Sequence, residues 1–422
     1  MLDHAPNAKT EEMHQEETLI RMRAKIAAAL AVLAAVTVQA WPGVSRAAEP
    51  GVTDAEITIG MFAPLSGPLV AYGVDPLAAS RMLYEEANKA GGINGRKVKI
   101  LVEDDKCNPN DLVAVVKKFV TVDNVFMLHG GSCTAALSAA IDYINREKVP
   151  YAMLNAAGDN AVFPPTKYVF GSFQGTQRSY AAAFAQFAAQ HLKAKRAAVI
   201  VHDDDYGKAN AAMAKATFDK LGVATVAIER IPPNISDVTA PLLKIREAKP
   251  DVILSGAYPA PAVLIAQKYG EFGMTNIPLL QSAQGIPTPS VFAKNVANPA
   301  ALENFFYTWA FSDIGDPAVR TKYVDMFKAY NNGREPGPFM MSGLPSAMAV
   351  IEGLKMAGRD LTREGFVQAM EKLSLKTDAM PGLLEFGPNR RDAARTMVII
   401  KYDGKSQKVM PGTYTWDGIE AN

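Results

Sequence analysis

The sequence is poor in metal ligands and in clustered charge. It has two cysteines, Cys107 and Cys133, in 422 residues, and two cysteines without histidines at ligand spacing do not form a zinc site, so no metal is expected. The 44 basic and 43 acidic residues leave a formal net charge of +1 and form no long run of one sign. No surface that tracks the phosphates of a nucleic acid is therefore expected.

Catalytic motifs are absent as well. No G-x-S-x-G, P-loop or G-x-G-x-x-G string occurs, and these are the strings that carry a nucleophile or cradle a phosphate in common α/β enzymes. We therefore predict a protein that is not an enzyme and has no cofactor. The 49% hydrophobic content suits a folded globular protein with more than one domain.

The N-terminus carries a targeting signal. Arg21, Arg23 and Lys25 precede an apolar run at residues 26–38, which at 13 residues is too short for an ordinary transmembrane helix. The pattern predicts a signal peptide with an upstream extension over residues 1–47. A membrane anchor or an amphipathic helix is the alternative, and translation starts at Met1 or Met22.

The predicted mature chain has no means of lipid attachment. No cysteine stands near the predicted cleavage site before Ala48, so we expect free diffusion in a periplasm. In that oxidising compartment a disulfide between the two cysteines is favoured, with two buried free thiols as the alternative.

From residue 57 onward, short β-branched runs alternate with amphipathic segments, a pattern typical of parallel-sheet units. One helix face repeats Leu112, Val116 and Phe119, and Asn110 is its predicted cap. The predicted strands of this first set are 57–61, 98–103, 125–128 and 151–154.

A second set of the same kind begins near Thr176. Its predicted strands are 197–201, 225–231, 251–255 and 278–281, separated by helices near 208–221, 239–248 and 260–272. The rest, from about Phe305, offers helices near 317–330, 342–356 and 363–373 and strands at 383–386 and 396–402. Two α/β sets of roughly 120 residues each predict two lobes of ordinary domain size.

Ligands of open parallel sheets collect at the carboxyl ends of the strands. After the third predicted strand, glycines lead into Thr134 and a helix predicted to run to about Arg146, whose first turn favours an anion. After the fourth comes the small-residue turn 155–158, whose amides suit the same anion. Tyr206 and Tyr258 follow strands of the second set. A carboxylate held where two lobes close is the predicted ligand.

At this point the sequence resembles the type I periplasmic binding proteins of the leucine/isoleucine/valine-binding kind, which feed branched-chain amino acid ABC transporters. The resemblance covers residues 56 to about 404. It rests on the order and spacing of Ile59-Gly60, Pro64-Leu65-Ser66-Gly67-Pro68, Tyr72-Gly73, Gly91-Gly92-Ile93-Asn94-Gly95, Asp104-Asp105-Lys106-Cys107-Asn108-Pro109, Cys133-Thr134, His202-Asp203-Asp204-Asp205-Tyr206-Gly207 and Gly256-Ala257-Tyr258-Pro259.

The resemblance implies an α/β fold of two Rossmann-like lobes with parallel-type sheets, joined by a hinge of three crossovers near 172–176, 306–311 and 388–395. It divides the chain into an N-terminal lobe of 48–174 plus 310–390 and a C-terminal lobe of 175–309 plus 391–422. It also implies a disulfide between Cys107 and Cys133.

Binding roles follow from the resemblance one residue at a time. Thr134 resembles the hydroxyl that binds the ligand carboxylate, beside the backbone of Ala156 and Ala157. The walls of the side-chain pocket are implied at Tyr72, Tyr206, Tyr258 and Phe339.

Two positions depart from the amino-acid-binding pattern. The residue expected to pair with a ligand ammonium falls at Gln284, and a hydroxyl expected near the carboxylate falls at Gly158. An ammonium buried without a carboxylate partner loses hydration with little return, so we favour a carboxylic acid without an α-ammonium, aromatic for example, over an amino acid or amide.

At several polar positions a purely structural role is the alternative to a role in ligand binding. Asp203, Asp204 and Asp205 either supply the missing charge or form a solvated turn that caps the following helix. His129 and His202 end apolar strands and are interpreted as structural. Gln284 is alternatively a turn residue without ligand contact.

The sequence thus predicts a monomeric periplasmic binding protein that delivers a small carboxylate solute to an inner-membrane ABC permease. The alternative is a periplasmic sensor that presents its ligand to a chemoreceptor or signalling receptor, because the same fold serves both uses.

Overall fold

The computed structural model describes residues 13, 15–25, 49–156, 158–286 and 289–415. Residues 15–25 are helical with exposed side chains. The apolar core and the cleavage site of the predicted signal peptide lie outside the described residues. Of the helices that the structure describes, none is both long and apolar enough to cross a membrane. Residues 49 onward form a compact unit of their own.

Five parallel strands form the first sheet of this unit, in the order β2-β1-β3-β4-β5. All eight residues of β1 pair with β2, from Glu56 with Lys97 to Ala63 with Asp104. The strands are β1 (Glu56–Ala63), β2 (Lys97–Asp104), β3 (Met127–Gly130), β4 (Tyr151–Met153) and β5 (Val169–Phe170).

The second sheet has the order β14-β13-β10-β9-β8-β6-β7, and β15 pairs with β13. Strands β6 to β10 are parallel, whereas β13 and β14 run antiparallel to their neighbours. Its strands are β6 (Arg196–His202), β7 (Ala224–Ile231), β8 (Val252–Gly256), β9 (Leu279–Gln281), β10 (Phe305–Trp309), β13 (Thr396–Tyr402), β14 (Gln407–Val409) and β15 (Tyr414–Thr415). A separate hairpin pairs β11 (Ser374–Lys376) with β12 (Leu383–Glu385).

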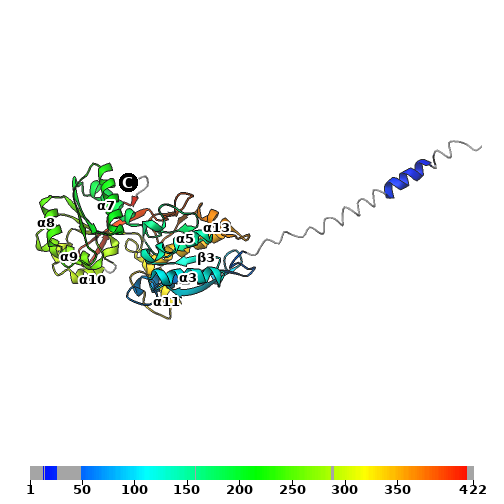
Figure 1. The fold of residues 1–422 in the computed structure, drawn as a ribbon, viewed down its shortest axis with the longest axis horizontal. Helices are drawn as coiled ribbons and strands as arrows, with labels where there is room; N and C mark the ends of the chain where they lie inside the picture. The colour runs from blue at the N-terminus through cyan, green and yellow to red at the C-terminus, as the bar shows by residue number, and fades with distance from the viewer. Residues whose placement is uncertain (1–12, 14, 26–48, 157, 287–288, 416–422) are drawn as a thin grey trace, which may run out of the picture. The chain divides into compact units, whose positions relative to one another are not determined.

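Helices cover both sheets, with α7 to α10 at one end of this unit and α3, α5, α11 and α13 at the other (Figure 1). The helices are α2 (Val74–Lys89), α3 (Pro109–Thr121), α4 (Thr134–Ser138), α5 (Ile141–Arg146), α6 (Gln177–Gln190), α7 (Asp205–Lys220), α8 (Thr239–Glu247), α9 (Pro259–Glu271), α10 (Pro289–Asn295), α11 (Pro317–Tyr330), α12 (Leu344–Ala357) and α13 (Arg363–Met370). Short 3-10 turns are η1 (Val70–Tyr72), η2 (Asp159–Ala161), η3 (Ala283–Gly285), η4 (Pro299–Leu302) and η5 (Met340–Gly343).

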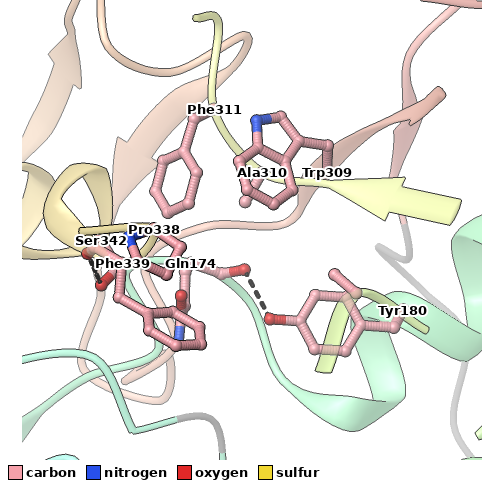
Figure 2. A pocket seen from close by; sticks show the side chains of 9 residues that line it. Gln174, Tyr180, Trp309, Ala310, Phe311, Pro338, Phe339 and Ser342 are labelled. Atoms are coloured by element: carbon pink, nitrogen blue, oxygen red, sulfur yellow. Dashed lines mark hydrogen bonds between the residues drawn. The ribbon is translucent and has the colours of Figure 1, made fainter. Parts of the chain in front are cut away.

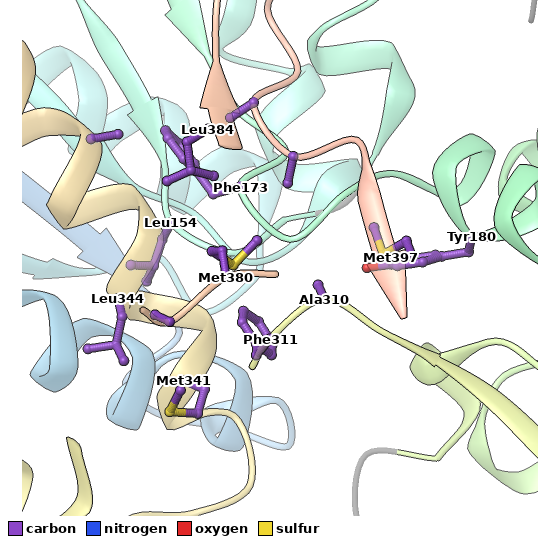
Figure 3. Packing of buried hydrophobic residues seen from close by; sticks show 14 of the residues in the cluster. Leu154, Phe173, Tyr180, Ala310, Phe311, Met341, Leu344, Met380, Leu384 and Met397 are labelled. Carbon is purple, nitrogen blue, oxygen red and sulfur yellow. The ribbon is translucent and has the colours of Figure 1, made fainter. Parts of the chain in front are cut away.

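The chain passes between the sheets three times. It leaves the first sheet after β5, returns after β10 to place α11 and α12 against α2, and enters the second sheet again at β13. Phe173 and Phe311 on the first two passages and Met397 at the start of β13 belong to the same buried cluster as residues of both sheets (Figure 3). The two-lobed α/β fold with its three crossovers is confirmed, and the lobe boundaries stay a prediction.

Most predicted elements are present, and four local predictions were wrong. Asn108, and not Asn110, caps α3, because Pro109 lacks an N–H and already fits the first helical position. The third strand lies two residues later, at Met127–Gly130. The helix expected from Thr134 to Arg146 is broken by a turn at residues 139–140. Much of the crossover expected at 306–311 is strand β10.

Gly343, between η5 and α12, marks a close approach of α12 to α2. A Cβ at this position would lie 1.9 Å from the carbonyl oxygen of Pro76, and Ser80 donates a hydrogen bond of 2.6 Å to the Gly343 carbonyl. Gly343→Ala should therefore lower the free energy of unfolding by about 1–3 kcal/mol, the usual cost of overpacking. Urea denaturation measures this loss of unfolding free energy. The control is Gly387→Ala, whose Cβ would meet nothing closer than 3.6 Å, and equal stability of the two variants would contradict the prediction.

Candidate functional site

A pocket opens where the passages between the sheets meet the ends of the strands. Its lining comes from the first passage and α6, from the turn after β9, from the end of β10 and the passage that follows it, and from η5 and the segment that leads into it (Figure 2). The lining residues are Gln174, Tyr180, Ala283, Trp309, Ala310, Phe311, Pro338, Phe339 and Ser342. Elements attached to both sheets therefore share this pocket.

On the side of the first sheet, two predicted wall residues are in contact. The rings of Tyr72 and Phe339 stack with centroids 4.4 Å apart. The Tyr72 carbonyl accepts hydrogen bonds from the Ser132 hydroxyl at 2.9 Å and from the Asn155 amide at 3.0 Å, and Asn155 also donates to Ser342 at 3.2 Å. Burial raises the pKa of the Tyr72 hydroxyl, which stays neutral at physiological pH. Of this pair, Phe339 lines the pocket, and Tyr72 stacks against it without belonging to the lining.

On the side of the second sheet, the other two predicted wall residues lie together. The ring centroids of Tyr206 and Tyr258 are 5.4 Å apart. The Tyr206 hydroxyl bonds Ser282 at 2.9 Å, and burial raises its pKa. The Tyr258 ring stacks on His202 at 4.1 Å, and its hydroxyl donates to Asp204 at 2.8 Å. Burial, followed by that hydrogen bond, raises the pKa of Tyr258.

The predicted anion donors occupy the turn after β3 and the turn after β4. Thr134 is the first residue of α4, and among the residues that the structure describes neither its hydroxyl nor the backbone N–H of Ala156 has a hydrogen-bond partner. A Cβ at position 158 would lie 1.9 Å from Cγ2 of Thr134. Glycine there leaves room for the Thr134 side chain, which accounts for the missing hydroxyl.

For two predicted binding residues the structure gives no side-chain contacts. Ala157 lies outside the described residues, and of Gln284 the structure describes only the backbone, within η3. Their roles stay predictions.

Three of the polar residues with competing interpretations, Asp204, His129 and His202, have structural partners. Asp204 caps α7 by accepting from the Gly207 N–H at 2.8 Å. His129 is buried between the Tyr84 and Ser346 hydroxyls, at 2.8 and 2.9 Å, and burial lowers its pKa to about 3. His202 accepts the Tyr258 N–H at 2.7 Å, and burial lowers its pKa. The interpretation of the histidines as structural fits these contacts, and the Tyr258 contact also ties His202 to a predicted wall.

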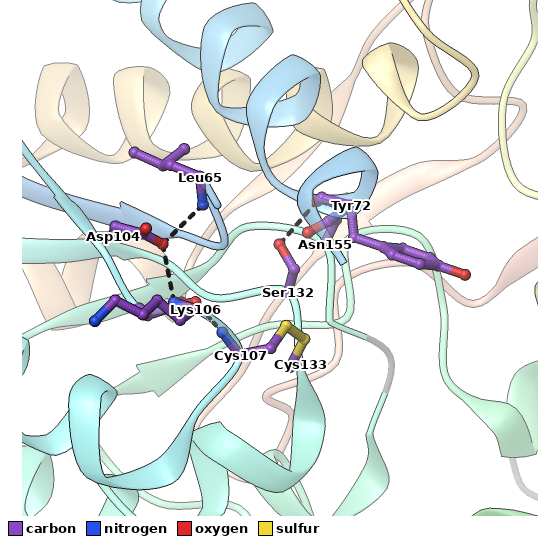
Figure 4. Close-up of a disulfide and its surroundings, with 9 residues drawn as sticks. Leu65, Tyr72, Asp104, Lys106, Cys107, Ser132, Cys133 and Asn155 are labelled. Atoms are coloured by element: carbon purple, nitrogen blue, oxygen red, sulfur yellow. Dashed lines mark hydrogen bonds between the residues drawn. A yellow bond between two sulfur atoms is a disulfide. The ribbon is translucent and has the colours of Figure 1, made fainter. Parts of the chain in front are cut away.

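A disulfide joins two loops that follow strands of the first sheet. Cys107 and Cys133 are joined, with Cα atoms 5.4 Å apart (Figure 4). The neighbouring Asp104 accepts from the Leu65 and Lys106 N–H groups at 2.8 and 2.9 Å. The bridge therefore connects the loop after β2 to the residue before Thr134, while Asp104 holds the loop that leads to Tyr72.

Asp105 in the same loop is fully buried; one carboxylate oxygen accepts from the Cys107 N–H at 2.9 Å, and the other has no hydrogen-bond partner among the described residues. Burial raises its pKa from 3.8 to about 6. The folded state therefore binds the proton more tightly than the unfolded state, and the resulting stability is present below about pH 3.8 and lost as the pH rises through about 6.

Asp105→Asn keeps an oxygen acceptor but cannot ionise. From pH 4.5 to pH 7.5, the wild type should lose about 2 kcal/mol of unfolding free energy relative to this variant, because about 1.5 pKa units of the shift lie above pH 4.5. Urea denaturation at both values measures the difference. Asp54→Asn, at an exposed position, is the control and should follow the wild type. A constant difference between wild type and Asp105→Asn would contradict the prediction.

Of the nine lining residues, the sequence predicted Phe339 and missed the other eight, which include Gln174, Tyr180, Trp309, Phe311 and Ser342. Gln174, Trp309 and Phe311 stand in or beside predicted crossovers, which were treated as connections. The aromatic rings of Trp309 and Phe311 in a predicted crossover could have indicated that this segment contacts a ligand.

Comparisons with known proteins agree on one family. The family model described as "Periplasmic binding protein" matches residues 56–408. A Leu/Ile/Val-binding protein homolog 3 of Brucella melitensis is 27% identical over 304 residues, which are 72% of this chain and 80% of the relative.

Solved structures show the same fold. An ABC transporter substrate-binding protein from Sphaerobacter thermophilus superposes with a TM-score of 0.74 at 19% identity, covering 87% of this chain and 99% of that one. A solute-binding protein of an R. palustris ABC transporter, in complex with 4-hydroxybenzoate, has a TM-score of 0.70 at 18% identity, covering 85% and 97%.

Proposed function

The chain belongs to the type I periplasmic binding proteins of the branched-chain amino acid family, and from that premise we propose that it captures a small carboxylate solute between two lobes and delivers it to an inner-membrane ABC permease. The protein acts in the periplasm as a monomer. Its N-terminal lobe comprises 48–174 and 310–390, and its C-terminal lobe 175–309 and 391–422.

The pocket shared by elements of both sheets supports this proposal most directly. A ligand in it touches the first passage at Gln174, the loop after β9 at Ala283 and the segment leading into η5 at Phe339. Because these groups are attached to different lobes, a bound ligand stabilises their approach. Closure about the three passages is the expected response.

The free donors supply the anion contact. The hydroxyl of Thr134 and the N–H of Ala156 have no partner among the described residues, and donors of this kind form strong, charge-assisted hydrogen bonds with a carboxylate. We assign the backbone of Ala157 to the same anion contact. Tyr72, Tyr206, Tyr258 and Phe339 form the walls around the rest of the ligand.

The second sheet offers little to an ammonium group. The carboxylate of Asp204 already caps α7 and accepts the Tyr258 hydroxyl, and position 284 carries glutamine. An acid without an α-ammonium therefore suits the site better than an amino acid.

A thermal-shift screen of amino acids and of aromatic and aliphatic acids tests the function, since a ligand of the folded state raises the melting temperature. We expect one or more carboxylates to stabilise the protein and to reduce its radius of gyration in small-angle scattering. If no carboxylate raises the midpoint, or if saturation leaves the radius unchanged, the proposal is wrong.

A further inference from the structure

Four of the nine residues that line the pocket are aromatic, and none carries a formal charge at neutral pH. Tyr180, Trp309, Phe311 and Phe339 lie around it in Figure 2. Trp309 and Phe311 come from the end of β10 and the passage that follows, Tyr180 from α6 and Phe339 from the other side of the pocket. An ammonium placed among them would have no carboxylate in the lining to pair with, whereas an uncharged ring would contact rings.

Trp309 is held in one orientation by a buried acid. Its indole N–H donates to Asp313 at 2.7 Å, and Asp313, only 2% exposed, also binds Arg320 at 3.1 Å. The indole packs edge-on against Phe311, with centroids 5.4 Å apart and an interplanar angle of 82°. The polar edge of Trp309 is therefore already used, and its hydrocarbon surface is what it presents to the pocket.

The polar groups of the remaining lining are likewise engaged with the protein. The Tyr180 hydroxyl donates to the Gln174 carbonyl at 3.1 Å, the Gln174 side-chain amide donates to the Asn155 carbonyl, and Ser342 donates to the Phe339 carbonyl at 2.6 Å. These hydrogen bonds fix the walls without directing their donors to a ligand. The pocket is therefore preorganised for a rigid apolar group.

This ring-lined region adjoins the predicted anion donors. Phe339 stacks on Tyr72, the Tyr72 carbonyl accepts from Asn155, and Asn155 precedes Ala156 in the chain. A ligand that places its carboxylate at Thr134 and Ala156 has its body on the side of these rings.

We propose that Trp309 is the specificity residue of this pocket and that, with Phe311 and Phe339, it selects the planar ring of an aromatic carboxylate over saturated acids and aliphatic amino acids. The inference rests on the proposed function, since it presumes that the same cleft holds the carboxylate. Ring-on-ring contact adds preference beyond buried area, so an aromatic ligand should bind about 10-fold more tightly than a saturated one of the same size.

Isothermal titration calorimetry with three ligands separates the contribution of the aromatic ring from the effect of an ammonium group. Benzoate and cyclohexanecarboxylate share a carboxylate and a six-carbon ring but differ in aromaticity, and L-leucine adds an ammonium. The wild type should prefer benzoate to cyclohexanecarboxylate by about 10-fold, Trp309→Leu should reduce that preference to about 2-fold or less, and Trp309→Phe should retain most of it. Because Trp309→Leu also removes the packing of the indole on Phe311, Phe311→Leu is the second variant, and melting temperatures identify any unfolded protein.

The outcomes are distinct. The inference is overturned if the wild type binds cyclohexanecarboxylate or L-leucine as tightly as benzoate, or if Trp309→Leu and Phe311→Leu weaken all ligands by the same factor. Binding of L-leucine alone overturns the inference and leaves the proposed function standing. Binding of none of the three, together with a silent carboxylate screen, overturns both.

Discussion

Replacing Thr134 by valine should lower the affinity for the best carboxylate of the screen by about 10- to 100-fold, because a hydrogen bond to a charged group contributes about 1.5–3 kcal/mol. Valine keeps the shape of threonine and removes only the hydroxyl. That hydroxyl has no partner among the described residues, so its loss should leave the unfolding free energy nearly unchanged. Isothermal titration calorimetry and urea denaturation measure the two quantities.

The matched control is Thr121→Val. Thr121 is exposed at the end of α3, and its hydroxyl donates to the Lys117 carbonyl, so this variant should bind as the wild type does. Equal affinities of the Thr134 and Thr121 variants would show that the carboxylate binds elsewhere.

Removing the disulfide with Cys107→Ala and Cys133→Ala together should lower the free energy of unfolding by about 3.5 kcal/mol. The bridge closes a loop with a sequence separation of 26, and a crosslink of that length restricts the unfolded chain by roughly this amount. The affinity should fall as well, because the bridge fastens the residue before Thr134 to the loop after β2.

Guanidinium denaturation with and without a reducing agent distinguishes the stability lost with the disulfide crosslink from the stability lost with the packing of the two side chains. Reduction should destabilise the wild type to the level of the double variant and should leave the double variant unchanged. A loss below about 1 kcal/mol would mean that strain in the folded protein offsets the restriction of the unfolded chain.

Hydrophobic periodicity predicted much of the fold. The helix Pro317–Tyr330 and the strand Thr396–Tyr402 have the bounds that the sequence indicated, because proline marks a helix start and β-branched runs mark buried strands. Strand β10 was not recognised. Its residues Phe305–Trp309 are mostly aromatic, and they are strand because β9 and β13 pair with them from distant parts of the sequence.

The candidate site likewise contains residues that the sequence predicted and residues that only the structure revealed. Tyr72, Thr134, Tyr206 and Tyr258 follow strands or the loops after them, where the topology of a parallel sheet predicts a ligand. Trp309 and Gln174 become pocket residues only when the passages fold back between the sheets. Local sequence cannot predict that, because the neighbours of each residue come from other parts of the chain.

The interleaved path of the chain has a consequence for biosynthesis. Strand β13 pairs with β10 across nearly a hundred residues, Phe305 with Tyr402, and α12 packs on α2 from the far end of the sequence. The first sheet ends with β5 at Phe170, but a growing polypeptide completes the second sheet only after β13 and β14 have been translated, and α2 waits for α12. Because pairs so far apart in the sequence must form before this sheet is complete, folding is expected to be slow.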